Sequence, residues 1–157
     1  MRENIRAILH KVANAFLPGD VEFEKILNAI ALAESNGNPN AEGDGGWSIG
    51  LFQNHMRDGR GRGYTKEQLL NPLFNATLAA KELVKYYNRG KQQGLSGANL
   101  ATYVSKFGQR PAPGNEVHAG RNYGRMVGDG AVSTNEPQMR SNTIANPEHI
   151  TTEQLRQ

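Results

Sequence analysis

The sequence predicts a mainly α domain of the α+β kind with one small β-hairpin. Apolar residues recur at helical spacing in several segments along the chain. One glycine-rich stretch, residues 35–64, breaks that period and leaves room for a hairpin within residues 42–56. At 157 residues the chain is long enough for one core and too short for two domains of ordinary size.

The first predicted helix covers residues 3–17 and is amphipathic. Pro18 and Gly19 end its pattern. Such a stripe can lie on a membrane, but docking on the core is more common, and we favour that interpretation. Asp20 is the expected N-cap of a second helix that ends near Glu34, where Asn36 begins a break. The apolar positions of the first helix are Ile5, Ile8, Leu9, Val12 and Phe16.

Further helices are predicted after the glycine-rich stretch. Thr65 and Gln68 match a capping box. Asn71 is the expected N-cap of a long helix, with Pro72 in its first position. Ser96 is the expected cap of the next helix, which glycine and proline of residues 108–114 end. The last predicted helix covers residues 115–127 and presents Val117, Tyr123 and Val127.

The domain is expected to occupy residues 1–128, followed by a polar tail or linker over residues 129–157. The tail contributes −2 to the net charge of +3, so residues 1–128 carry +5. This balance favours contact with an anionic polymer or surface. The tail has the composition of a linker, and we expect it to be held by a partner or by its own domain. The N-terminus lacks the apolar core of a signal peptide, and no apolar stretch is long enough for a transmembrane segment.

Several kinds of site are not expected. The chain has no cysteine, and its four histidines are scattered, so neither a metal site nor a cofactor is predicted. The stretch "RDGRGRG", residues 57–63, could grip phosphates. Without interleaved aromatic residues or a helix-turn-helix pattern, specific nucleic-acid binding is not expected.

Glu34 is the candidate general acid. The negative end of the helix dipole and apolar neighbours both favour its protonated form. The alternative is a surface glutamate paired with an arginine. The blocks "ESNGNPNA", "GWSIGLFQ" and "NPLFNATLAAKEL" resemble the signature of the lysozyme-like superfamily, in its soluble lytic transglycosylase type. The resemblance covers roughly residues 23–125 and implies a lysozyme-like α+β fold, with the hairpin beside an active-site cleft.

The resemblance implies roles for individual residues. Glu34 matches the acid/base that cleaves the β-1,4 bond between N-acetylmuramic acid and N-acetylglucosamine in peptidoglycan glycan strands. Ser48 and Gln53 match residues that line the cleft and orient substrate. Gly50 is expected to let the backbone approach the sugar closely. Asn71 and Asn75 match the helix start after the cleft, where we expect capping.

The sequence departs from the family at a later helix. "ATYVSKFGQ" is its nearest match to an Ala-Tyr-Asn-Ala-Gly block, so Tyr103 is the candidate for a tyrosine near the acid. "KFGQRPAP" resembles a segment of phage tail lysozymes, which suggests a virion-associated enzyme. "GDGGWSIGLFQ" also resembles goose-type lysozymes, in which an aspartate matching Asp44 holds a hydrolytic water; a structural turn is the alternative. Trp47 and Tyr64 are candidates for stacking on sugars, and a core role is equally open for Trp47.

The function predicted from these residues is a peptidoglycan lytic transglycosylase that needs no cofactor. A hydrolysing lysozyme using Asp44 is one alternative. A virion or secretion-apparatus subunit with a lysozyme-like fold is another, with residues 129–157 as its contacts. The expected location is the virion, or the periplasm or cell wall, reached without a signal peptide.

Overall fold

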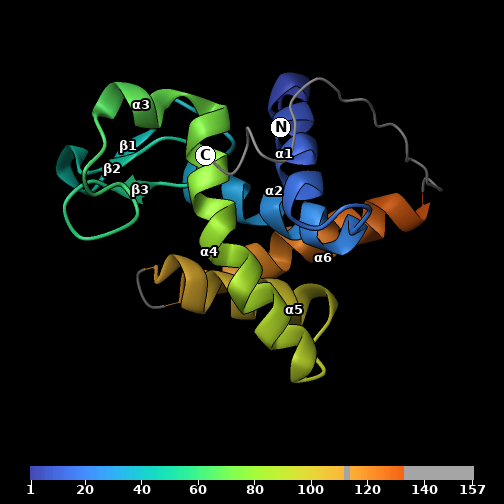
Figure 1. The fold of residues 1–157 in the computed structure, drawn as a ribbon. Helices are drawn as coiled ribbons and strands as arrows, with labels where there is room; N and C mark the ends of the chain where they lie inside the picture. The colour runs from blue at the N-terminus through green and yellow to red at the C-terminus, as the bar shows by residue number, and fades with distance from the viewer. Residues whose placement is uncertain (112–113, 133–157) are drawn as a thin grey trace.

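The computed structural model describes residues 1–111 and 114–132. Helices build most of the described chain, and a small sheet lies beside them at one end of α4 (Figure 1). The helices are α1 (Glu3–Phe16), α2 (Val21–Ser35), α3 (Lys66–Leu70), α4 (Pro72–Gln92), α5 (Gly97–Val104) and α6 (Glu116–Val132). The mainly α fold with a small antiparallel sheet is therefore confirmed. Residues 133–157, most of the predicted tail, lie outside the described residues.

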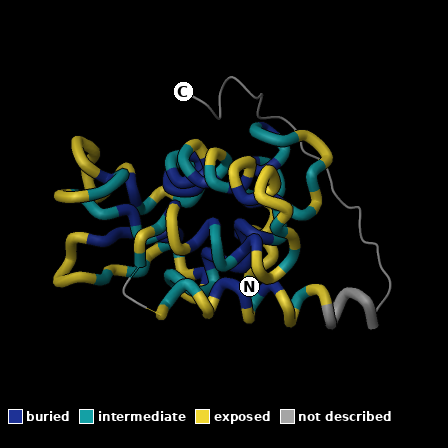
Figure 2. Tube along the Cα trace, turned by 90° about the horizontal axis from the view of Figure 1, so that it is seen from below, coloured by how far each residue is buried: buried dark blue, intermediate teal, exposed yellow. Residues whose placement is uncertain are grey.

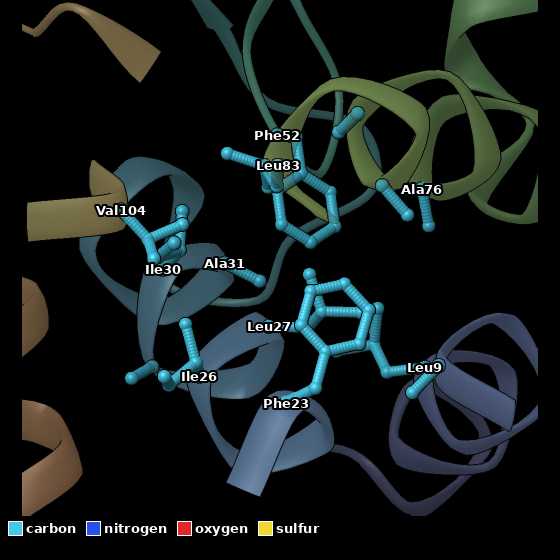
Figure 3. Packing of buried hydrophobic residues seen from close by; sticks show 14 of the residues in the cluster. Leu9, Phe23, Ile26, Leu27, Ile30, Ala31, Phe52, Ala76, Leu83 and Val104 are labelled. Atoms are coloured by element: carbon cyan, nitrogen blue, oxygen red, sulfur yellow. The ribbon is translucent and has the colours of Figure 1, made fainter. Parts of the chain in front are cut away.

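Helix α2 is the centre of the core. It buries Phe23, Ile26, Leu27 and the run Ala29–Ala31, and α1, α4, α5 and α6 all pack against it. Phe52, from the loop beside the sheet, enters the same cluster between α2 and α4 (Figure 3). Buried segments gather in the middle of the molecule, while the loop that carries the sheet is largely exposed (Figure 2). Residues 36–65, which connect α2 to α3 and are called the site loop below, are thus anchored to the helical core through an aromatic side chain.

The first helix docks on the core, as favoured. Ile5, Leu9 and Val12 are fully buried, and the helix contacts α2 and α4. Within the described residues, no helix is both long and apolar enough to cross a membrane.

Three of the four predicted helix caps are confirmed. Asp20 accepts from the backbone N–H of Phe23 at 3.0 Å, Thr65 forms the capping box, and Asn71 caps α4. Ser96 occupies the N-cap position of α5 as predicted, but its side chain makes no capping hydrogen bond. The backbone N–H of Gly97 donates instead to the Glu22 carboxylate at 2.7 Å. A distant carboxylate therefore replaces the local hydroxyl at the start of α5.

The glycine-rich stretch forms three strands of two residues each, rather than one hairpin. They are β1 (Glu42–Gly43), β2 (Ser48–Ile49) and β3 (Asn54–His55), in the antiparallel order β1-β2-β3. Glu42 pairs with Ile49, and Ser48 pairs with His55. Ladders this short supply few backbone hydrogen bonds, so the loop needs other support.

The last helix differs from its prediction. Val117 and Val127 are exposed, whereas Tyr123 is buried among α2, α5 and α6. Burial, with the charges of Glu22 and Asp20, raises the pKa of Tyr123 to about 12. The helix runs to Val132, past the predicted domain boundary at residue 128.

Asn75 of α4 supplies the support that the short strands lack. Its side chain is fully buried. Its Nδ2 donates to the carbonyl oxygens of Ile49 and Leu69, both at 2.9 Å, and its Oδ1 accepts from the N–H of Phe52 at 2.8 Å. The capping role expected for Asn75 was wrong: it holds the loop on α4.

Replacing Asn75 with alanine should destabilise the fold strongly. The change removes three hydrogen bonds that a buried side chain makes to backbone groups, and we expect a loss of roughly 3 kcal/mol or more in unfolding free energy. Asn88→Ala, at an exposed position of the same helix, should change it by less than about 0.5 kcal/mol. Urea unfolding measures both, and equal losses would contradict the assigned role.

Candidate functional site

Glu34 lies in the last turn of α2, where the helix meets the site loop. It is partly buried. The next residue, Ser35, donates from Oγ to the carbonyl oxygens of Ala31 at 3.1 Å and Leu51 at 2.8 Å. Asn36 then ends the helix in the left-handed conformation, with φ 57°. The end of α2 is therefore fixed to the loop directly beside the candidate acid.

The pKa of Glu34 is raised above the ordinary glutamate value. Burial is the largest cause, and the nearby negative charge of Asp44 acts in the same direction. A side-chain hydrogen bond with Gln109 and the positive charge of Arg60 act against it. Burial outweighs both, so the protonated form, which a general acid requires, is more favoured here than in an ordinary glutamate.

Arg60 is an internal residue of the site. Its Nε donates to Asn54 at 2.7 Å, and its Nη1 donates to Glu82 at 3.2 Å and to the carbonyl oxygen of Gly108 at 3.1 Å. Its Nη2 donates to Oε1 of Gln109. Arg60 therefore links the loop to α4 and to the turn after α5. Of the arginines in the stretch 57–63, only Arg57 and Arg62 are exposed, which weakens the case for phosphate binding.

Asp44 and Ser48 lie together. The Ser48 hydroxyl is buried and donates to Oδ2 of Asp44. Asp44 is exposed and takes the left-handed conformation, with φ 51°. Its negative charge acts to raise the pKa of Glu34. Ser48 thus orients the second carboxylate of the site.

Gln53 and Gly50 shape the loop from inside. Gln53 is left-handed, with φ 51°, and its Nε2 donates to the carbonyl oxygens of Ala41 and Gly50 at 3.2 and 3.0 Å. Gly50 has φ 82°, and an added Cβ would lie 2.5 Å from Nδ2 of Asn75 and 2.6 Å from the Leu69 carbonyl oxygen. The close approach at Gly50 is therefore to α4, whereas we expected an approach to a sugar.

The structure does not bring Tyr103 to Glu34. Its hydroxyl accepts from Nε2 of Gln93 at 3.0 Å, its ring lies 4.8 Å from that of Phe107, and it packs beside Gly90. These partners place Tyr103 near the C-terminal end of α4, because the sheet and Asn75 lie at the opposite end. Gln109, from the turn Ser105–Gln109 that follows α5, acts on the Glu34 pKa instead, and its Nε2 donates to the Phe52 carbonyl oxygen at 2.9 Å.

Two aromatic side chains are exposed beside the site loop. Trp47 is 42% exposed, so the core role left open for it is excluded. The Arg57 guanidinium lies 4.9 Å from its ring centroid, and the His55 ring stacks at 6.3 Å. Tyr64 is 38% exposed and meets Phe74 edge-on at 5.1 Å. Both keep surface available for stacking on a ligand.

The site has the parts for acid catalysis on an uncharged bond. It combines a carboxyl with a raised pKa on α2 with a second carboxylate and a positive charge from the loop. A shallow hollow lies elsewhere, lined by Glu67, Gln68, Asn71 and Phe74. In the described part of the chain, no group of three or more His, Asp or Glu side chains could hold a metal ion.

Replacing Gly50 with alanine should lower the unfolding free energy more than replacing Gly63. Both changes strain a left-handed backbone, but only the first also creates a steric clash. Gly63 also has positive φ, 89°, but open space around its Cβ position. Gly63→Ala should cost about 1–2 kcal/mol for the left-handed backbone alone. Gly50→Ala should cost a further 1–3 kcal/mol or so, because Asn75 must move. Denaturant unfolding of both variants measures the difference, and equal costs would contradict the packing at Gly50.

Glu34→Gln should stabilise the folded chain near neutral pH. The folded state binds the Glu34 proton more tightly than the unfolded state does, so above both pKa values the carboxylate lowers stability, and below both it does not. The melting temperature of the variant should exceed that of the wild type at pH 7–8, and the gap should close below about pH 4. Glu67→Gln, exposed on α3, controls for loss of a charge. A Glu34→Gln variant less stable than the wild type at pH 8 would show that burying the Glu34 carboxylate does not lower stability, which would contradict this prediction.

Comparison with known proteins identifies the family. Residues 19–103, more than half of the chain, match the protein family described as lysozyme like domain. This range includes Glu34, Asp44, Ser48 and Gln53, while Gln109 lies beyond it. The comparison with curated proteins and that with solved structures each gave no match. The match supports peptidoglycan cleavage of the glycosidase type in general, and the chain belongs to the family of lysozyme-like domains.

Proposed function

We propose that this protein is a lytic transglycosylase that cleaves the β-1,4 bond between N-acetylmuramic acid and N-acetylglucosamine. The observation that supports it best is the environment of Glu34, where burial raises the carboxyl pKa at a helix end fixed to the loop. The family match supplies the substrate class. The fold by itself would not establish activity, so the proposal depends on this carboxyl.

The reaction needs one acid that later becomes a base. Glu34 gives its proton to the glycosidic oxygen as the bond from that oxygen to C1 of the muramic acid breaks. The resulting carboxylate then takes a proton from the C6 hydroxyl of the same sugar as its oxygen bonds to C1. The product is a 1,6-anhydro sugar, no water is consumed, and Glu34 is protonated again.

A hydrolysing lysozyme is the second candidate, favoured by the position of Asp44. Ser48 orients the Asp44 carboxylate, and its charge reaches Glu34. Such a carboxylate could direct a water at C1, as the second carboxyl does in inverting glycosidases. The two candidates predict different chain ends: anhydro ends for the transglycosylase and reducing ends for the hydrolase.

The test is mass spectrometry of fragments from purified peptidoglycan. We expect anhydromuramic ends with the wild type, and a rate lowered by about 10²–10⁴-fold in Glu34→Gln, because the general acid is lost. Asp44→Asn should keep the anhydro product. Reducing ends that vanish in Asp44→Asn would favour the hydrolase. A folded wild type that releases no fragment would favour a structural virion or secretion-apparatus subunit.

Location is a separate proposal. We propose that the protein is virion-associated, or delivered to the periplasm or cell wall, and that residues 129–157 contact a virion or secretion-apparatus protein. The resemblance of "KFGQRPAP" to phage tail lysozymes supports it.

A further inference from the structure

The net positive charge of residues 1–128 is concentrated in one segment. Residues 81–110 contain six lysines and arginines and one acid, Glu82, which gives a charge of +5. Since residues 1–128 together carry +5, the remainder of that range has no net charge. The segment includes the second half of α4, all of α5 and the turn Ser105–Gln109. These three elements pack against one another, so the excess cations lie on neighbouring surfaces.

Most of these cations have no acidic partner. Lys91 pairs with Glu22 at 3.3 Å, and Glu82 pairs with Arg60 of the site loop at 3.2 Å. None of the other five cations forms an ion pair with another residue that the structure describes. All five are exposed: Lys81, Lys85, Arg89, Lys106 and Arg110. These five cations are therefore available to an anionic ligand.

Three of the five cations form one stripe on α4. Lys81, Lys85 and Arg89 recur at four-residue spacing, so they cover about 12 Å of the same helix face. The Arg89 guanidinium also lies 5.1 Å from the ring centroid of Tyr86. Tyr86 is one turn after Glu82, whose carboxylate pairs with the site loop. The stripe and the site loop therefore meet on the same part of α4.

A group of three aromatic rings borders the stripe. The rings of Tyr86 and Phe107 stack with their centroids 6.5 Å apart, and the ring of Tyr103 lies 4.8 Å from that of Phe107. Phe107 is 44% exposed, and Nζ of Lys106 lies 5.5 Å from its ring centroid. An exposed ring among cations suits a ligand that offers both apolar faces and negative charges.

The position of Phe107 is fixed by the residue that follows it. A Cβ at Gly108 would lie 2.4 Å from Cδ2 of Leu83 and 3.4 Å from Cδ2 of Tyr86, so the turn packs closely on α4. The carbonyl oxygen of Gly108 accepts from Nη1 of Arg60 at 3.1 Å. The turn therefore joins the aromatic group directly to the site loop, and one extended polymer can contact both.

We propose that the five cations and the aromatic group bind a peptidoglycan strand through its stem peptides. The cations contact the carboxylates of the peptides, and the ring of Phe107 stacks on a sugar. In a strand that carries its peptides the sugars are uncharged, and the free carboxylates belong to the peptides. The inference rests on the proposed function and adds to it a preference for strands that still carry their peptides.

Two other anionic partners fit this surface less well. An anionic membrane binds surfaces that offer a broad apolar area, whereas Phe107 is the one exposed ring of the three. Single-stranded nucleic acid stacks successive bases on several rings, and here Tyr86 and Tyr103 are partly buried. Contact with the site loop favours the polymer that is cleaved at the site.

Co-sedimentation with purified sacculi tests the proposal. The chain carries Glu34→Gln, so the polymer stays intact. One sample of sacculi is unmodified, and in a second the peptide carboxyl groups are converted to neutral amides, which leaves the sugars unchanged. The test variant combines Lys85→Gln, Arg89→Gln and Lys106→Gln. The matched control removes the same charge from exposed positions of α1 and α6, by combining Arg6→Gln, Arg121→Gln and Arg125→Gln.

The test variant should bind unmodified sacculi about tenfold more weakly than its parent, because three exposed ion pairs are lost. This loss should disappear on amidated sacculi, and also in about 1 M salt, where charges are screened over about 3 Å. The control variant should bind as its parent does. Phe107→Ala should weaken binding about fivefold to both kinds of sacculi, because the ring contacts the sugar.

Equal binding by the test and control variants would overturn the proposal, and so would a tenfold loss that persists on amidated sacculi. Unchanged binding in Phe107→Ala would overturn the stacking. Tighter binding to anionic lipid vesicles or to oligodeoxythymidylate than to sacculi would also overturn the proposal, in favour of a membrane or a nucleic acid. None of these measurements requires cleavage. If the wild type cleaves no peptidoglycan but binding follows the expectation, the proposed function fails and the assigned surface stands.

Discussion

The buried amide of Asn75 is the interaction on which the rest of the site depends. The three strands have only two residues each, so backbone pairing alone cannot order the loop. Asn75 satisfies groups on Ile49, Phe52 and Leu69, and its own carbonyl oxygen accepts from Asn54 at 3.1 Å. The loop that carries Asp44 and Ser48 is therefore held on α4 by Asn75, with the Arg60–Glu82 pair as a second link to the same helix.

From Asn54 the same network continues into the charges of the site. Arg60 is mostly buried, with 13% of its side chain exposed, which is costly for a cation unless it is paired and hydrogen-bonded. Its N–H groups donate to the side-chain oxygens of Asn54, Glu82 and Gln109. They also donate to the backbone carbonyl of Gly108. One of these partners, Gln109, also acts to lower the Glu34 pKa. Structural support and control of the acid are thus carried by the same residues.

The sequence predicted what depends on neighbouring residues. Asp20, Thr65 and Asn71 cap helices because capping is local, and Glu34 falls at a helix end because Asn36 breaks the period. Interactions between distant segments were missed: no spacing indicates that Gln109 reaches Arg60 and the Phe52 carbonyl. The same holds for Ser96, whose capping role passes to Glu22. Family likeness suggested Tyr103, but the turn after α5 brings a different side chain to the acid.

The links between sequence-distant segments have a consequence for folding. Asn75 and Phe52 are 23 residues apart, and Arg60 and Gln109 are 49 apart, so forming these contacts costs more loop-closure entropy than forming a local one. The burial that raises the Glu34 pKa exists only in the folded chain. Under the proposed function, a molecule that has lost these contacts therefore lacks the general acid that cleavage requires.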